Sequence, residues 1–110
     1  MSERTGSNKY TDVAPSVTPV GSVYKQDACA TTNTIIPLSN DKTALKTAID
    51  SYTAGGNTAG HMGTAWAWYM ISPNWSEVWP AASQPQAYSK MSELNRFNQP
   101  SLRKIAVLMT

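Results

Sequence analysis

Large aliphatic side chains are scarce in this chain, because leucine, isoleucine, valine and phenylalanine together make 17 of its 110 residues. Such a low content would indicate disorder if the net charge were large, but the formal net charge is only +2. A chain of this length builds one domain at most. The composition therefore predicts a single domain with a small core and argues against a two-domain enzyme.

Cysteine and histidine occur once each, as Cys29 and His61. A single cysteine excludes an internal disulfide framework and a multi-cysteine metal cage, and a single histidine excludes a multi-histidine site. We expect Cys29 to be a small buried residue, with pairing to a cysteine outside this chain as the alternative. His61 is expected to pack or to face solvent rather than to act as a general base or a ligand.

Clustered charge and long apolar runs are also missing. The 9 basic and 7 acidic residues are not gathered in any one segment, which argues against a nucleic acid or an anionic membrane as partner. The longest apolar runs, 65–71 and 105–109, fall short of the roughly 18 residues that span a bilayer. We therefore expect no membrane segment in this stretch of sequence.

The sequence divides into two regions near residue 33. Residues 1–33 contain four valines and no leucine, isoleucine or phenylalanine. Such a segment can bury little apolar surface against the entropy cost of ordering it, so we expect it to be extended or mobile. Residues 34–110 carry the periodic patterns and are expected to form the folded part.

Apolar periodicity predicts the helices of the second region. Apolar residues recur at i, i+3, i+4 and i+7 over about 41–53 and again over about 60–71, where Ser72 and Pro73 end the pattern. A shorter pattern indicates a third helix over about 86–96.

Two further segments have the composition of strands. Residues 34–38 are rich in β-branched side chains around Pro37, which cannot donate to a ladder, so an edge strand is predicted. Residues 102–109 are nearly all apolar after Arg103 and Lys104, as in a strand covered on both faces. The order strand, helix, helix, strand predicts an α/β architecture.

Three groups of residues are candidates for function. The loop between the two helices exposes backbone amides and hydroxyls that could receive an anion or lie beside a metal, or it is a plain turn; its residues are Gly55, Gly56, Asn57 and Thr58. A partner surface could be formed by the aromatic rings of Trp68, Trp75 and Trp79. Ser39 and Lys42 match the S-x-x-K pair of serine hydrolases, although helix capping explains them better.

Three stretches resemble a known family: 35–42 (IIPLSNDK), 53–58 (TAGGNT) and 61–68 (HMGTAWAW). They are similar to TadG-like proteins (TadE/TadG family) of the bacterial tight-adherence (Flp) pilus locus. The resemblance covers roughly residues 34–110. It implies a fragment of a von Willebrand factor A-like domain, which is a three-layer α/β fold of Rossmann type.

The same resemblance bears on metal binding. Domains of this kind hold a divalent cation through a D-x-S-x-S motif, a loop threonine and a later aspartate. Thr58 matches the loop threonine, but D-x-S-x-S does not occur in this sequence. One neutral hydroxyl cannot hold magnesium, which prefers several oxygen ligands. We therefore expect no cofactor in this fragment and Mg²⁺ only in an intact parent domain.

The resemblance implies a non-enzymatic adhesion or pilus-assembly module. The intact parent would contact a protein partner, a pilus or cell-envelope component, through its metal-dependent site. The parent would be membrane-anchored, with this region in the periplasm or at the cell surface and soluble as a fragment. Two alternatives stay open: a carbohydrate- or surface-binding module that uses the three tryptophans and, more remotely, a serine hydrolase that uses Ser39 and Lys42.

Overall fold

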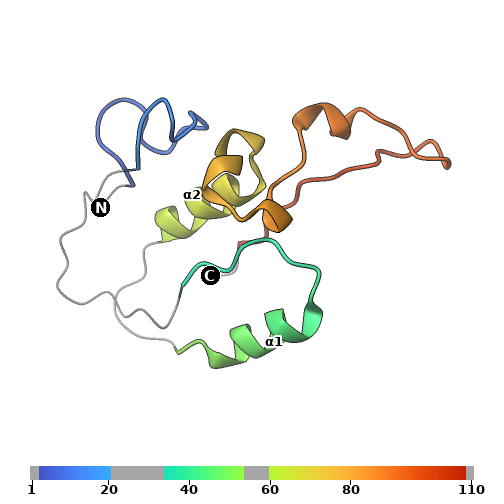
Figure 1. Ribbon diagram of the computed structural model, residues 1–110, viewed down its shortest axis with the longest axis horizontal. Coiled ribbons are helices and arrows are strands. Elements are labelled where there is room, and N and C mark those ends of the chain that lie inside the picture. The colour runs from blue at the N-terminus through green and yellow to red at the C-terminus, as the bar shows by residue number, and fades with distance from the viewer. Residues whose placement is uncertain (1–2, 21–33, 54–59, 109–110) are drawn as a thin grey trace.

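Two α-helices are the longest regular elements of the computed structural model (Figure 1): α1 (Lys42–Ser51) and α2 (Gly60–Ile71). Three short 3-10 helices follow them: η1 (Pro73–Val78), η2 (Ala81–Ser83) and η3 (Tyr88–Met91). The structure describes residues 3–20, 34–53 and 60–108. Within this part of the chain, the helices expected over about 41–53 and 60–71 are confirmed.

Short polar side chains set the helix boundaries. The Asp41 carboxylate accepts a hydrogen bond from the Ala44 backbone N–H at 2.9 Å and so caps the start of α1. The Ser72 hydroxyl accepts from the Asn74 N–H at 3.2 Å and caps η1, in which Pro73 occupies the first turn. Because the residue before a proline disfavours helical backbone, α2 ends at Ile71.

The expected α/β fold is wrong. No sheet is present among the described residues, whose only strand pairing is an isolated antiparallel bridge between Leu94 and Pro100. Neither 34–38 nor 102–108 belongs to a strand, because neither segment has a neighbour with which to form a ladder. A buried strand needs hydrogen-bonding partners for its backbone, and apolar composition alone does not supply them.

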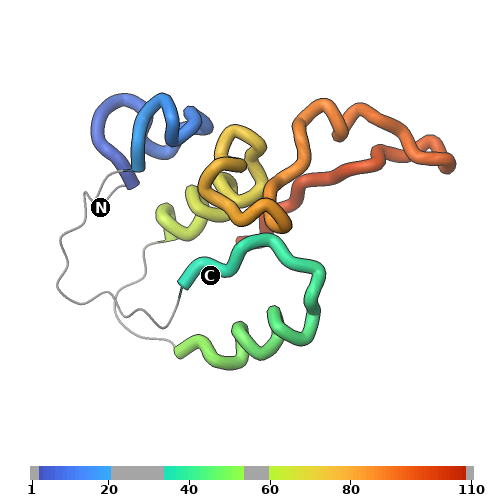
Figure 2. The backbone as a smooth tube through the Cα atoms, in the orientation of Figure 1, coloured from blue at the N-terminus to red at the C-terminus, as the bar shows by residue number. Residues whose placement is uncertain are grey.

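The expected third helix is also wrong, since only η3 forms in the stretch 86–96. The Asn95 side chain accepts hydrogen bonds from the N–H groups of Phe97 and Gln99 at 2.8 and 3.1 Å. These bonds stabilise a turn at the expense of helix. The chain then reverses, so that 102–108 runs back beside the segment that led outward and the two form a long arm (Figure 2).

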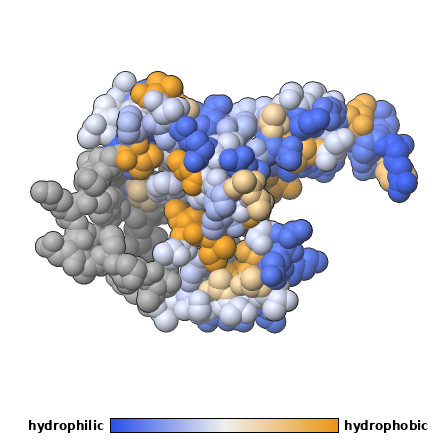
Figure 3. Space-filling view, in the orientation of Figure 1, coloured by the Kyte–Doolittle hydropathy of each residue, from blue (hydrophilic) through white to orange (hydrophobic). Residues whose placement is uncertain are grey.

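Only a small core is enclosed. The apolar side chains that are fully buried among the described residues are Tyr69, from α2, and Trp75, from η1. The Cα radius of gyration is 15.9 Å, against about 13 Å for a compact domain of this length. Apolar residues are correspondingly visible on the surface in the middle of the molecule, above α1 (Figure 3). None of the described helices is long and apolar enough to cross a membrane.

Residues 3–20 lie against α2 and η1, in contrast to the extended or mobile segment expected there (Figure 1). The Ser16 N–H donates to the Glu77 carboxylate at 2.6 Å, and the Asn74 amide donates to the Asp12 carbonyl and carboxylate at 3.1 Å each. These bonds link positions about sixty residues apart in the sequence. The boundary near residue 33 stays a prediction.

Candidate functional site

Four aromatic side chains at the α2–η1 junction pack together: Trp66, Tyr69, Trp75 and Trp79. The rings of Tyr69 and Trp75 are stacked, with centroids 3.6 Å apart and planes inclined by 9°. Trp66 meets both rings edge-on, and the Trp79 indole N–H donates to the Tyr69 carbonyl at 3.1 Å. We call these four residues the aromatic cluster. The break at Ser72 and Pro73 folds η1 back onto α2 and so brings them together.

A buried arginine covers this cluster. The Arg4 side chain is fully buried, and its guanidinium carbon lies 4.9 Å from the Trp75 ring centroid. Its nitrogens donate to three backbone carbonyls of the same segment, at 2.8 to 3.0 Å, those of Thr11, Val13 and Thr18. A guanidinium with several fixed donors suits this position, where a single side chain closes a loop and also stacks on an aromatic face.

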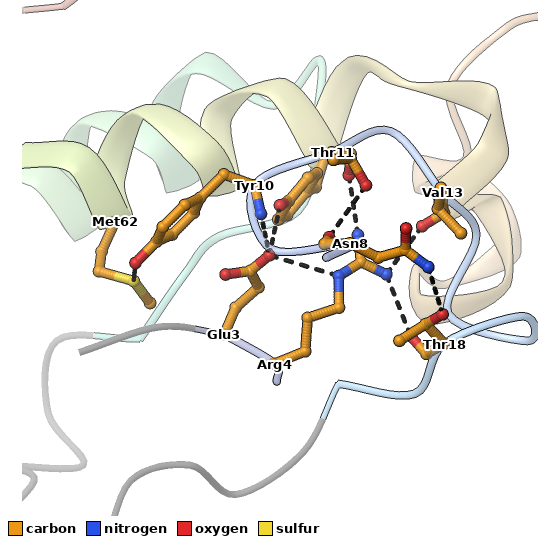
Figure 4. Close-up of polar contacts among 9 residues, drawn as sticks. Glu3, Arg4, Asn8, Tyr10, Thr11, Val13, Thr18 and Met62 are labelled. Atoms are coloured by element: carbon orange, nitrogen blue, oxygen red, sulfur yellow. Dashed lines mark hydrogen bonds and ion pairs between the residues drawn. The ribbon is translucent and has the colours of Figure 1, made fainter. Parts of the chain in front are cut away.

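The neighbouring carboxylate balances this charge (Figure 4). Glu3 Oε1 accepts hydrogen bonds from the Tyr10 N–H at 2.6 Å, the Tyr69 hydroxyl at 2.8 Å and the Arg4 Nε at 3.3 Å. The other oxygen, Oε2, is buried and has no hydrogen-bond partner in the described structure. We call Glu3 and Arg4 the buried ion pair; it fastens residues 3–20 to the aromatic cluster.

The surroundings shift two pKa values. Burial alone would raise the pKa of Glu3, but hydrogen bonds from the Tyr10 N–H and the Tyr69 hydroxyl outweigh it and the pKa lies below its ordinary value. Burial, together with the hydrogen bond to Glu3, raises the pKa of Tyr69 to about 12. Both shifts favour the observed pair of an ionised carboxylate and a neutral phenol.

The lowered pKa of Glu3 predicts a specific acid response. The ionised form stabilises the folded chain above the pKa of the unfolded state, and this contribution is lost as the pH falls through the lower folded pKa. Between about pH 5 and pH 3, the free energy of unfolding should therefore fall more steeply for the wild type than for Glu3→Gln. Urea unfolding at several pH values measures both slopes, and equal slopes would contradict the assignment.

A second feature lies on the exposed face of α2, next to the buried ion pair. It is a groove of about 490 Å³ lined by Tyr10, His61, Thr64, Ala65, Trp68 and Tyr69. The Tyr10 ring meets the His61 imidazole edge-on, with centroids 5.8 Å apart, and its hydroxyl reaches the Met62 sulfur at 4.0 Å (Figure 4). We call this feature the Trp68 groove.

The three tryptophans assigned to a partner surface do not share one surface. Trp75 is fully buried in the aromatic cluster and cannot contact a partner, so that part of the prediction is wrong. Trp79 is half-buried, with its indole N–H bound inside the protein. Trp68 alone of the three is exposed, over 49% of its surface.

The predictions for the loop between α1 and α2 and for Cys29 stay untested. Gly55, Gly56, Asn57 and Thr58 lie outside the described residues, as does Cys29. The part of the chain that is described holds no group of three or more His, Cys, Asp or Glu side chains suited to a metal. Thr58, which the resemblance assigns to a Mg²⁺ site, is not among these described residues, so the expectation of no cofactor in this fragment stays a prediction.

The serine and lysine of the S-x-x-K match do not interact. The Ser39 hydroxyl accepts from the Asp41 N–H at 3.1 Å and so takes part in the turn before α1. No hydrogen bond joins it to Lys42 in the described structure. The residue that caps α1 is Asp41, whereas Ser39 belongs to the turn before the helix and Lys42 is the first residue of α1.

The residues that organise this region were not found from the sequence. Glu3, Arg4 and Tyr10 belong to a segment whose composition predicts little burial, and adjacent opposite charges are common on exposed surfaces. The abundance of hydrogen-bonding and charged groups near the N-terminus gives no indication of which of them is buried. Only the fold shows that Arg4 stacks on the aromatic cluster.

Comparisons with known proteins give no relative. No family model matches the chain, and neither any curated protein nor any solved structure does.

Proposed function

We propose that this chain is a non-enzymatic protein-binding module of the adhesion and pilus-assembly class. The observation that carries this proposal is an apolar, extended segment, 105–108, with largely exposed side chains and no backbone hydrogen bond to another segment of the described structure. Ile105, Val107 and Leu108 expose 70, 79 and 63% of their surfaces. Apolar side chains this exposed in one short stretch favour contact with another protein.

The backbone of the same segment supports a specific mode of binding. Among the described residues, no backbone hydrogen bond joins 102–108 to any other segment. An extended chain with free N–H and C=O groups can pair with a strand of another protein, while alternate side chains fill pockets on it. We therefore propose strand addition along 105–108, with an extended segment of a protein partner as its occupant.

The N-terminal end of the segment 105–108 is anchored by the residue before it, Lys104. The Lys104 ammonium donates to the Ile71 carbonyl at 2.5 Å and to the Gln86 carbonyl at 2.6 Å. The Ile71 carbonyl is at the C-terminus of α2, where a cation is favourable. A segment fixed at one end loses less freedom on binding than a free peptide does, which favours pairing.

The sequence resemblance supports the class of partner. The stretches 35–42, 53–58 and 61–68 are similar to TadG-like proteins of the tight-adherence pilus locus. On that basis the proposed partner is a pilus or cell-envelope protein, and the proposed setting is the bacterial periplasm or cell surface, with a membrane-anchored parent. The exposed segment fits such a role because it offers main-chain pairing in addition to apolar contact.

A matched pair of variants tests strand addition. Val107→Pro removes a backbone donor and should abolish binding to purified tight-adherence pilus proteins, whereas Val107→Thr keeps the donor and the β-branched shape and should retain it. Hydrogen exchange should show protection of the amides of 105–108 in the complex. Binding of Val107→Pro as tight as that of the wild type, or no binding by the wild type, would overturn the proposal.

A further inference from the structure

The Trp68 groove has a regular origin in α2. His61, Thr64, Ala65 and Trp68 are spaced i, i+3, i+4 and i+7 and therefore lie on one face of the helix. Ala65 is the smallest of them and leaves a hollow between its larger neighbours. Tyr69, which is stacked in the aromatic cluster, forms the base of that hollow.

The opposite wall comes from residues 3–20. Tyr10 has φ +57°, a left-handed conformation that is unusual for a bulky side chain, and its N–H is held by Glu3 at 2.6 Å. The buried ion pair thus fixes the backbone of Tyr10, whose ring rests against His61. Tyr10 and Trp68 remain 44 and 49% exposed, so two aromatic rings at the edge of the hollow are accessible to a ligand.

The lining indicates the chemistry of a ligand. Among the described residues, no Lys, Arg, Asp or Glu side chain lines the groove, so this lining supplies no permanent charge with which to select a phosphate, a carboxylate or a cation. Aromatic rings supply apolar faces, and the Thr64 hydroxyl, which donates to the Gly60 carbonyl at 2.9 Å, keeps its oxygen lone pairs as acceptors. A neutral ligand with apolar faces and hydroxyl groups complements such a surface.

We propose that the Trp68 groove binds a neutral saccharide whose ring lies against Trp68. A pyranose ring combines apolar C–H faces with peripheral hydroxyls, which match the aromatic rings and the Thr64 hydroxyl. The volume of about 490 Å³ is within the range of roughly 300 to 1,000 Å³ typical of small-molecule sites. The groove shares no residue with the segment 105–108. Saccharide binding there would be a second activity, separate from the proposed protein binding.

Titration of ¹⁵N-labelled protein with cellobiose, chitobiose, maltose and lactose tests this proposal. At least one disaccharide should shift the amide signals of 61–69 and the Trp68 indole N–H in a saturable way. Trp68→Ala should weaken binding by about tenfold or more, and Thr64→Val, which removes the hydroxyl at nearly constant shape, should weaken it less. Phe97→Ala removes an aromatic ring that is 66% exposed elsewhere and should bind as the wild type does.

Three results would overturn it. Absence of saturable shifts with every disaccharide would show that the groove is not a saccharide site. Equal affinity of Trp68→Ala and wild type would place any binding elsewhere. Saturation by indole without a response to disaccharides would identify a pocket for planar aromatic compounds instead. Val107→Pro should bind saccharide normally, which separates this proposal from strand addition.

Discussion

Replacing Trp75 with alanine is expected to lower the free energy of unfolding by about 3 to 5 kcal/mol, the usual cost of truncating a fully buried aromatic residue. Trp75 has no exposed surface, stacks on Tyr69 at 3.6 Å and lies beneath the Arg4 guanidinium. Since Tyr69 and Trp75 are the large apolar side chains that are fully buried among the described residues, few others are available to fill the cavity. Urea unfolding followed by near-UV circular dichroism measures the loss.

The matched control is Trp68→Ala, which removes the same side chain from a half-exposed position and should cost about 1 kcal/mol or less.

Trp75→Phe tests the unpaired indole N–H of the buried residue. The Trp75 indole N–H is buried without a hydrogen-bond partner in the described structure, and such a group costs about 1 to 3 kcal/mol. Trp75→Phe removes the unpaired N–H and with it this cost. The free energy of unfolding should therefore fall clearly less for Trp75→Phe than for Trp75→Ala. Equal losses for Trp75→Ala and Trp68→Ala would contradict the position of the core.

Replacing Arg4 with alanine is the second change expected to have a large effect, again about 3 to 5 kcal/mol. The variant leaves the Glu3 carboxylate buried without its counter-charge, and it leaves three carbonyls without their donor. An uncompensated buried charge is costly, so residues 3–20 should separate from the aromatic cluster. Thermal unfolding and limited proteolysis of this segment measure the two consequences.

Two comparisons make the Arg4 result specific. Lys9→Ala removes a positive charge at an exposed position of the same segment and should change stability by about 0.5 kcal/mol or less. The double variant Glu3→Gln with Arg4→Met removes both charges together. The free energy of unfolding that this double variant loses should be smaller than the sum of the losses measured for Glu3→Gln alone and Arg4→Met alone. The reason is that the double variant leaves neither partner charged and unpaired. Additive losses would show that the two side chains are not energetically coupled.

Local sequence patterns predicted the helices well because their determinants lie within a few residues. Asp41 and the dipeptide Ser72-Pro73 act on neighbouring backbone groups, so the start of α1 and the end of α2 follow from hydrogen bonding and proline sterics. The third helix failed for a local reason, the hydrogen bonds that the Asn95 side chain accepts from the backbone, but the two wrong strand predictions concern pairing over longer distances. The apolar character of 102–108 indicates that the segment can be a strand, but only a second strand beside it would make it one.

The candidate site shows the same division. The sequence named Trp68 with Trp75 and Trp79 as a possible partner surface, and of these three the structure leaves Trp68 half-exposed and encloses Trp75. The groove beside Trp68 depends on Tyr10, which is more than fifty residues away in the sequence and is positioned through Glu3. A periodicity within one helix cannot indicate a wall supplied by a distant segment.

The low aliphatic content by itself determined that this protein has little material for a core, and local patterns determined where α1 and α2 form. The tertiary structure alone decided that two of the few buried positions go to an arginine and a glutamate, and that Trp75 rather than Trp68 is enclosed. The physical reason is that helix formation satisfies backbone hydrogen bonds within one segment. Burying a charge requires a counter-charge and donors that are brought together only when residues 3–20 pack on α2 and η1.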